Sequence, residues 1–494
     1  MGGSAGDTGR IRRTLSSGAA RALALRAEPP TRAWELSFVA EVDRAHLVML
    51  SDAGLIDPAH SARLLGEMAR LAAENFQSLE EAEAPRGLYL LYESFLIERL
   101  GEAIGGALHT GRSRNDLNAT VLRLQLRAPA ASLLRELLRL AALLLARARR
   151  HRDAVMPVYT HGQAALPGSY GHYLAGVAQP LLRSAEALLG WMGGDVDLCP
   201  LGAGAAAGTS LPIRPEITAA LLGFGAPVRN SLDSVASRDF IVRLLAEAAT
   251  AGIVLTRFAA DLQAWTSAEF GFLHLPDALA GSSSMMPQKR NPYLLEHIQG
   301  RAALPLGALV SAVSAMQSKP FTNHIAAGTE AAAGTRDSLA SLASASALAR
   351  AMLFGAVPRL EAMRRRAESG FLEATEISNR LVLAGIPFRT THRLVGKAIT
   401  EALERDPESS GAKLAEALAA AAPAADLAGL DPASIMASTA QGGGPGRLLL
   451  PDSLDEERAR LRALVAGLDR RERQWLDAKA RLDDRVERLV RSAG

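Results

Sequence analysis

Cysteine is nearly absent from this chain, and aromatic residues are few. Among 494 residues the only cysteine is Cys199, and Phe, Trp and Tyr together make up 4%. One cysteine excludes an intramolecular disulfide framework and a cysteine-built metal site, and it fits a reducing compartment such as the cytoplasm. Ala and Leu supply most of the 48% apolar residues, and β-branched residues are sparse. Because Ala and Leu lose little rotamer freedom in a helix, the composition predicts an all-α fold.

A strong charge imbalance and a long apolar run are also lacking. The chain has 55 Lys and Arg residues against 52 Asp and Glu residues, a net charge of +3. This near balance is not typical of a nucleic-acid-binding protein, although the pI is about 9.1. No uninterrupted apolar stretch reaches the ~18 residues that span a bilayer, and the nearest, 133–150, carries arginines and a glutamate. We therefore expect neither nucleic acid nor membrane as a partner.

Helical periodicity organises most of the chain, and we find no internal repeat of 20–50 residues. Apolar residues recur at spacings of three and four through 133–150, 241–265, 292–318, 330–355 and 373–405. The first 30 residues are rich in Gly, Ser and Arg, which predicts a flexible tail, with a transit peptide as the alternative. The predicted regions are a tail over 1–30, shorter helices over 31–108, a long-helix bundle over 109–360, a small helical domain over 361–450 and a charged amphipathic tail over 451–494.

The last region carries apolar residues at strict intervals of seven, namely Leu461, Leu468, Trp475, Leu482 and Leu489. Such spacing forms one seam on a helix. The seam predicts packing either against a helix of a partner or against the chain's own bundle, and the pattern does not decide between the two.

Two stretches concentrate hydrogen-bond donors where a bundle should be apolar. HTGRSRND (109–116) has two arginines, whose planar forks suit carboxylates, with Ser and Asn as neutral donors. The alternative is a helix start capped by Asn115 or Asp116. YTHGQ (159–163) surrounds a histidine with Tyr, Thr and Gln, which suits a hydrogen-bonded imidazole at a site, although a lone histidine is more often structural.

Two further stretches are unusual in the same way. NSLDSVASRDF (230–240) contains Arg238 between acidic residues, and it could also be an ordinary ion-paired helix start. GSSSMMPQKRNP (281–292) contains three serines, Lys289 and no acid. A serine becomes a base only where a cation and backbone N–H groups favour the alkoxide, which Lys289 and a following helix N-terminus could supply. The alternative is a Ser-rich linker.

These four stretches, in this order, resemble the signature regions of argininosuccinate lyase in the aspartase/fumarase superfamily. PLGAGAAAGTSLP (200–212) and IPFRTTHRLVGKAI (386–399) also resemble that family. The resemblance covers roughly 35–450. It implies the three-domain aspartase/fumarase fold with a central long-helix bundle, a homotetramer with active sites shared by three subunits, and a β-elimination that needs neither cofactor nor metal. GAGAAAG (202–208) could alternatively be a nucleotide-binding loop, but no strand-like stretch precedes it.

The resemblance also implies roles for individual residues. Counting six residues back from Lys289 identifies Ser283 as the catalytic base and leaves Ser282 where the family has glycine. Lys289 and Asn291 would stabilise the carbanionic intermediate, and His161, made more basic by Glu296, would help with protonation. The residues that would bind substrate, with Asn291, are Ser113, Arg114, Asn115, Thr160, Gln163 and Arg238.

The resemblance weakens where the family recognises the arginine end of its substrate. KPFTNHIAAGTEAAAG (319–334) lacks the family's Tyr, Gln and Lys, and Val39 lies near the position of a family Asp. A pocket without those polar contacts should bind a guanidinium poorly. We therefore predict release of fumarate from another N-substituted aspartate, such as an N,N′-disuccinate or a biosynthetic succinyl-amine. The alternatives are the argininosuccinate lyase of arginine biosynthesis and a catalytically silent structural homologue.

Overall fold

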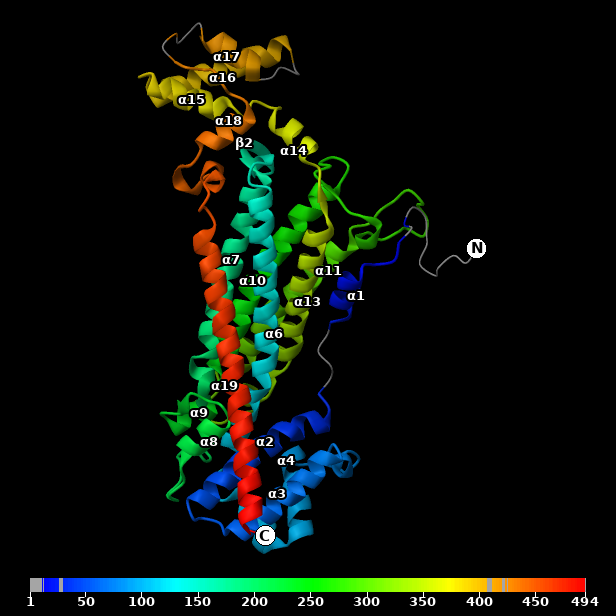
Figure 1. Cartoon of the computed structure of the whole chain (residues 1–494), viewed down its shortest axis with the longest axis vertical. Helices are drawn as coiled ribbons and strands as arrows, with labels where there is room; N and C mark the ends of the chain where they lie inside the picture. The colour runs from blue at the N-terminus through cyan, green and yellow to red at the C-terminus, as the bar shows by residue number, and fades with distance from the viewer. Residues whose placement is uncertain are drawn as a thin grey trace.

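A bundle of long helices forms the centre of the molecule (Figure 1). The computed structural model describes residues 11, 13–25, 30–406, 411–419, 423 and 425–493. The prediction of an all-α protein with a central bundle is confirmed. The bundle helices are α6 (Arg114–Arg150), α7 (Tyr170–Met192), α10 (Asp239–Thr266), α11 (Tyr293–Met316) and α13 (Thr335–Gly355).

Helix α6 runs through the whole bundle and has 37 residues. At 1.5 Å per residue it is about 55 Å long. Its leucines at three- and four-residue spacing, Leu133, Leu137, Leu140 and Leu144, have no exposed surface. The periodicity seen in the sequence is therefore the buried face of this helix.

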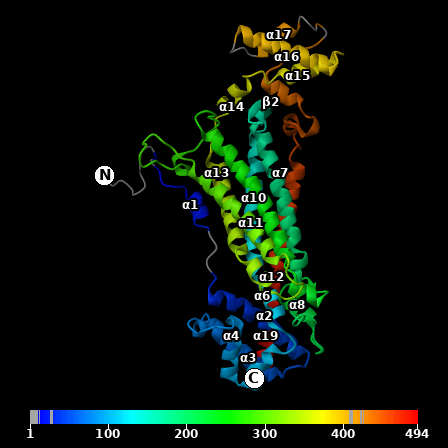
Figure 2. The same ribbon diagram turned by 180° about the vertical axis from the view of Figure 1, so that it is seen from behind.

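A smaller helical domain lies at each end of the bundle (Figures 1 and 2). The N-terminal domain contains α2 (Arg32–Asp52), α3 (Pro58–Ala73), α4 (Leu88–Leu100) and α5 (Glu102–Gly105). The opposite end carries α14 (Leu360–Ala367), α15 (Ala374–Leu383), α16 (Phe388–Arg405), α17 (Gly411–Ala419) and α18 (Pro432–Ser438). Short helices α8 (Pro215–Leu221), α9 (Ser231–Ala236) and α12 (Ile325–Gly328) lie near the N-terminal domain.

The strands are short, and each pair connects neighbouring segments of the chain by backbone hydrogen bonds. An antiparallel hairpin of β1 (Val155–Thr160) and β2 (Gln163–Ser169) follows α6 directly. β3 (Leu198–Cys199) pairs in parallel with β4 (Ala226–Pro227), and β5 (Leu273–His274) pairs antiparallel with β6 (Val357–Pro358). The last pair ties the segment after α10 to the segment after α13.

The flexible tail predicted over 1–30 needs correction for part of that range. Helix α1 (Ser17–Ala24) packs on α13, with Ala19 and Ala22 at 0% and 5% exposure. The Ser344 hydroxyl donates to the Ala22 carbonyl over 2.7 Å, and a guanidinium nitrogen of Arg301 donates to the Leu23 carbonyl over 2.8 Å. An alanine-rich helix can dock closely on a bundle helix, which Gly/Ser/Arg composition alone does not reveal.

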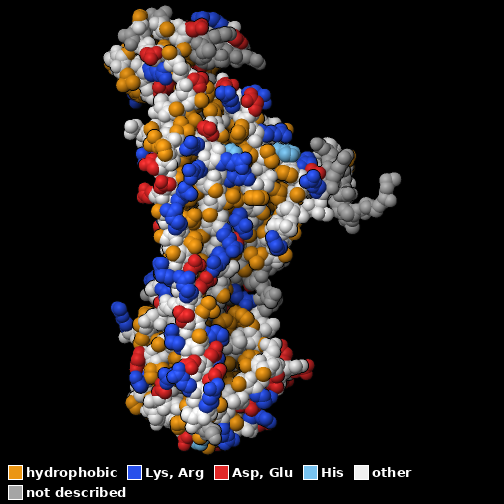
Figure 3. Space-filling view, in the orientation of Figure 1, with side chains coloured by type: hydrophobic (Ala, Val, Ile, Leu, Met, Phe, Trp, Pro, Cys, Tyr) orange, Lys and Arg blue, Asp and Glu red, His pale blue; other side chains and the backbone are white. Residues whose placement is uncertain are grey.

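The C-terminal helix α19 (Asp455–Ala493) packs along its own chain, as one of the two alternatives for the heptad seam predicts. Leu468 belongs to the core of the bundle and Leu482 to the core of the N-terminal domain. Ion pairs add to this contact, including Arg44–Asp483 at 2.5 Å and Arg471–Asp197 at 2.7 Å. Charged side chains of both signs follow the line of α19 (Figure 3). The helix therefore joins the bundle to the N-terminal domain.

One segment, Ile325–Gly355, is long and apolar enough to cross a membrane by length and composition. In the folded chain 67% of its apolar window is buried inside the molecule. This burial is typical of a core helix in a bundle.

We predict that Leu482→Ala lowers the free energy of unfolding by about 2–5 kcal/mol, because it leaves a cavity between α19 and the N-terminal domain. Leu482 has no exposed surface. Leu476→Ala is the matched control, since Leu476 lies on the same helix and is 66% exposed. Urea-induced unfolding followed by circular dichroism measures both. Equal effects of the two substitutions would contradict this packing of α19.

Candidate active site

The HTGRSRND stretch ends as the N-terminus of α6. Ser113 is the N-cap, and its hydroxyl accepts from the Asn115 N–H over 3.3 Å, while Asp116 accepts from the Ser113 N–H over 2.9 Å. This reciprocal arrangement is a capping box. The cap is thus Ser113 and not Asn115 or Asp116, which corrects the expected cap position. The Arg114 side chain is exposed, and its binding of a carboxylate stays a prediction.

Asp116 also holds the glycine-rich loop. Its second carboxylate oxygen accepts from the N–H groups of Gly202 and Gly204 at 3.0 and 2.9 Å. Burial raises the pKa of Asp116, and these N–H donors oppose the rise. Gly204 has φ +60°, and a Cβ there would lie 2.7 Å from the Gly208 carbonyl oxygen. The glycines thus allow a tight turn, which packs against the N-terminus of α6.

Asn115 connects three segments at this end of the bundle. Its side-chain N–H₂ donates to the Ala205 carbonyl over 2.9 Å, and its side-chain oxygen accepts from Asn323 over 2.9 Å. Asn323 belongs to KPFTNHIAAGTEAAAG, the stretch that departs from the family pattern. Figure 2 shows the following helix, α12, at this end of the bundle.

Arg238 lies at the same end but is only 2% exposed. Its guanidinium donates to the Ser237 carbonyl over 2.7 Å, and to the carbonyls of Ser234 and Val235 at 3.4 and 3.3 Å. Burial lowers its pKa to about 10. In the chain as described, Arg238 closes the C-terminal end of α9, and its contact with a substrate anion stays a prediction.

The YTHGQ stretch forms the turn of the β1–β2 hairpin at the other end of the bundle (Figure 1). Thr160, His161 and Gln163 are exposed, and His161 has φ +54°. The hairpin is anchored beside the turn, because the Tyr159 ring packs on Phe270 with centroids 5.7 Å apart. The three predicted residues Thr160, His161 and Gln163 are thus exposed to solvent on a hairpin that is anchored to the bundle by Tyr159.

GSSSMMPQKRNP forms a closed loop between α10 and α11, at the side of the bundle (Figure 1). Gly281 and Asn291 exchange two backbone hydrogen bonds of 2.8 Å at its base. The Asn291 side chain donates to the Ser282 carbonyl over 2.9 Å. Lys289 is exposed, and so is Glu296 in the first turn of α11.

Ser283 differs from its neighbours within this loop. Its hydroxyl oxygen accepts from the N–H of Met286 over 3.0 Å and from that of Met285 over 3.4 Å. Donors aimed at an oxygen favour its negatively charged form. The same bonds also make a compact Ser turn, so they order the loop as well.

Sequence reasoning missed the residues that anchor this loop. Arg290 pairs with Asp277 at 2.5 Å and donates to the Leu275 carbonyl over 2.6 Å. Beside it an open cavity of about 680 Å³ is lined by Arg290, Asn291 and His274, among others. The sequence does contain Arg290 and Asn291 directly after Lys289. The partners of Arg290, Asp277 and Leu275, lie 13 and 15 residues earlier and belong to no recognisable motif.

The predicted residues do not meet within one chain. Ser113, Arg114 and Asn115 precede α6, and His161 follows it, so the length of α6 separates them by about 55 Å. In the part of the chain that the structure describes, no three His, Cys, Asp or Glu side chains are grouped so as to hold a metal ion.

Two protein families match the sequence. Residues 91–304 match the family described as "Lyase", and residues 371–436 match the family described as "Argininosuccinate lyase C-terminal". The argininosuccinate lyase of Azotobacter vinelandii is 38% identical over 382 residues, 75% of this chain and 79% of that protein. The argininosuccinate lyase of Methanoculleus marisnigri is 39% identical over 368 residues, 72% of this chain and 73% of that protein.

The chain belongs to the argininosuccinate lyase-like family of the aspartase/fumarase superfamily. Among solved structures, EDDS lyase in complex with formate has a TM-score of 0.89 and 28% identity, covering 99% of both chains. An EDDS lyase variant with bound fumarate has a TM-score of 0.88 and 28% identity, covering 98% of both. The class II fumarase of Schistosoma mansoni shares the fold, at 16% identity and a TM-score of 0.66 over 83% of this chain and 92% of that one.

We predict that Asp116→Ala destabilises this family member by about 2–3 kcal/mol, because backbone N–H groups of Ser113, Gly202 and Gly204 lose their acceptor. Asp239→Ala is the matched control, since Asp239 also lies in the first turn of a bundle helix but its side chain is 46% exposed. Its loss should cost less than about 1 kcal/mol. Urea-induced unfolding compares the two, and similar losses would show that Asp116 does not hold the glycine-rich loop.

Proposed function

We propose that the chain is a carbon–nitrogen lyase that eliminates an amine from an N-substituted aspartate and releases fumarate. The observation that carries the proposal is the environment of Ser283, whose hydroxyl oxygen faces two backbone N–H groups in a loop without acids. Lys289 follows in the same loop, and α11 begins directly after it. These groups together favour a serine alkoxide.

In the proposed reaction, Ser283 removes the proton on the carbon next to the substrate carboxylate. The electron pair moves into that carboxylate, giving a dianionic intermediate, which Lys289 and Asn291 stabilise. Collapse of the intermediate breaks the C–N bond. His161, supported by Glu296, supplies a proton to the departing amine.

The other predicted residues bind the substrate. Arg114, with Ser113 and Asn115, offers a charged fork and neutral donors to a carboxylate. Thr160 and Gln163 add donors from the hairpin turn, and Arg238 adds a further positive charge. Every step of the proposed elimination uses side chains of this protein, and none requires a cofactor.

We further propose a homotetramer in which three subunits contribute to each active site. The separation of about 55 Å along α6 supports this, because one chain cannot bring its own Arg114 and His161 to one substrate. Helix α11 also exposes apolar side chains, with Leu304, Leu306 and Val310 between 50% and 58% exposed. Such an apolar surface is typical of a protein interface. The single, buried Cys199 fits the reducing cytoplasm that we propose as the location.

The proposed substrate is not argininosuccinate itself, because 319–334 lacks the family's Tyr, Gln and Lys. The similarity to EDDS lyase, including the variant with bound fumarate, supports an amine other than arginine. Argininosuccinate is the second candidate, favoured by relatives that are 38% and 39% identical. A silent structural homologue is the third, and the intact set of Ser283, Lys289, His161 and Glu296 argues against it.

We predict that the purified protein forms fumarate from N-substituted aspartates other than argininosuccinate. Fumarate absorbance would be followed with N,N′-disuccinates, succinyl-amines and argininosuccinate at equal concentration. Argininosuccinate should give the lowest kcat/KM, because its guanidinium lacks polar partners. A higher kcat/KM for argininosuccinate would establish the second candidate, and no turnover in either direction with any substrate would establish the third.

We predict that Ser283→Ala lowers kcat by at least about 10²- to 10⁴-fold, the contribution of a general base. Ser284→Ala is the matched control, since Ser284 is the exposed neighbour and should keep activity. Circular dichroism checks that both variants fold. A loss of activity in Ser282→Ala, with activity kept in Ser283→Ala, would show that the base is one residue earlier.

A further inference from the structure

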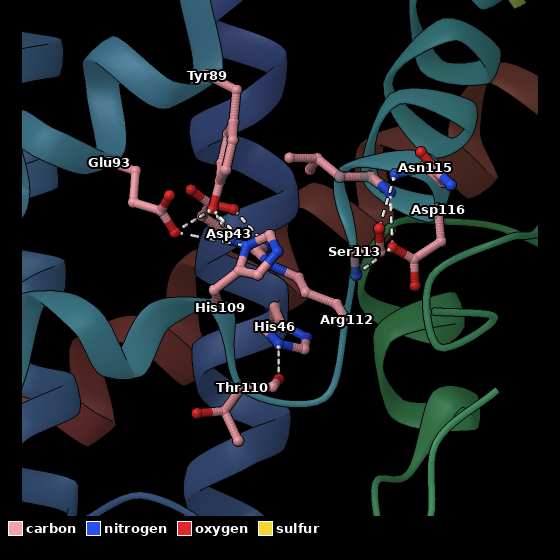
Figure 4. A network of polar contacts seen from close by, with 11 residues as sticks. Asp43, His46, Tyr89, Glu93, His109, Thr110, Arg112, Ser113, Asn115 and Asp116 are labelled. Carbon is pink, nitrogen blue, oxygen red and sulfur yellow. Dashed lines mark hydrogen bonds and ion pairs between the residues drawn. The ribbon is translucent and has the colours of Figure 1, made fainter. Parts of the chain in front are cut away.

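A buried polar cluster lies beside the predicted carboxylate-binding turn (Figure 4). Its centre is the ion pair between Arg112, in HTGRSRND, and Asp43 on α2, with a nitrogen–oxygen distance of 2.5 Å. Both side chains are 0% exposed. Arg112 is therefore a motif arginine that no substrate can reach in this chain, unlike its exposed neighbour Arg114.

Three residues that precede Ser113, namely His109, Thr110 and Arg112, are held by side chains of the N-terminal domain. His46 on α2 donates through Nε2 to the Thr110 carbonyl over 2.8 Å. Tyr89 on α4 lies 2.9 Å from His109 Nδ1, and Arg112 donates to the Tyr89 hydroxyl over 3.0 Å. Burial lowers the pKa of His46 well below its ordinary value, so this imidazole is neutral.

The backbone between these anchors has little freedom. Gly111 has φ +74°, and a Cβ there would lie 2.9 Å from the Ile213 side chain. Ser113 follows as the N-cap of α6, and Asp116 fixes the far side of the turn through Gly202 and Gly204. The positions of Ser113, Arg114 and Asn115 are thus set by the buried groups on either side of them.

The ion pair is costly to bury, because both charges lose their contact with water. Although Asp43 and Arg112 approach closely, neither carboxylate oxygen of Asp43 receives a hydrogen bond of standard angle from a described residue. Burial raises the pKa of Asp43, and Arg112 opposes that rise. A buried pair of this kind is weak support for stability but can fix one conformation.

We propose that Asp43 and Arg112 are positioning residues that set the geometry of the carboxylate-binding segment 113–115. This inference rests on the proposed function for the identity of the ligand. Arg112 acts through the backbone of the turn, and Asp43 acts through Arg112. Neither touches the substrate.

The test uses Asp43→Asn in the full-length protein, which removes the charge and keeps the shape. Calorimetry with fumarate should show a Kd raised about 10- to 100-fold, as expected when binding groups shift by about 1 Å. The KM for fumarate in the reverse addition should rise in parallel. Amide hydrogen exchange across 109–117 should accelerate. Glu93→Gln is the matched control, because Glu93 accepts from Tyr89 and lies 3.5 Å from His109 in the same cluster, whereas the ion pair of Arg112 is with Asp43. The Kd of this variant should change less than about 3-fold.

A second variant tests the inference if Asp43→Asn does not fold. Asp43→Asn with Arg112→Gln removes both charges, so no uncompensated charge is buried. It should regain the wild-type unfolding midpoint but keep the raised Kd and the faster exchange. A return of the wild-type Kd in this variant, or a wild-type Kd and exchange in folded Asp43→Asn, would overturn the inference.

Failure of the proposed function gives a different result. In that case the wild-type protein neither binds fumarate nor forms it, whatever happens at Asp43. Exchange across 109–117 then decides the positioning role alone, with acceleration in Asp43→Asn but not in Glu93→Gln supporting it and equal exchange overturning it.

Discussion

The length of helix α6 is the constraint on which the rest of the structure depends. Its 37 residues place the predicted carboxylate-binding turn at one end of the bundle and the hairpin with His161 at the other. No loop movement in a single chain spans about 55 Å of rigid helix. The active site that we propose would therefore combine ends from different copies. Rigid ends suit such a site, because an error at either end is carried into a site completed by another copy.

Different interactions make the two ends of α6 rigid. At both ends, exposed side chains are held in place by buried side chains next to them. At the hairpin, aromatic packing of Tyr159 on Phe270 fixes the strands while Thr160 and His161 stay exposed. At the start of α6, buried charges and backbone N–H groups fix the turn that carries Arg114. Polar anchoring costs desolvation but is directional, which suits a turn whose backbone conformation matters more than its bulk.

Local patterns in the sequence predicted what depends on local physics. The buried face of α6 followed from the spacing of its leucines, and the segment predicted over 330–355 is α13, Thr335–Gly355. The segment over 373–405 instead forms two helices, because Gly385 has φ +92° and Pro387 follows. Periodicity could not reveal contacts between residues far apart in the sequence. Examples are the docking of α1 on α13, the packing of α19 on the bundle and the Asp43–Arg112 ion pair. Capping by Ser113 was not foreseen, because Asn115 and Asp116 looked like the caps.

The same distinction explains why the type of reaction is easier to infer than the substrate. Ser283, Lys289 and Asn291 lie within one loop, so their order in the sequence already carries most of their geometry. Recognition of the amine is predicted to depend on 319–334, whose Asn323 donates a hydrogen bond to Asn115, far away in the sequence. A change in that stretch is therefore expected to act on the predicted carboxylate-binding segment as well as on the amine. If the proposed function holds, substrate selection is coupled to the turn held by Asp43 and Arg112, since Asn115 belongs to that turn and also bonds to Asn323.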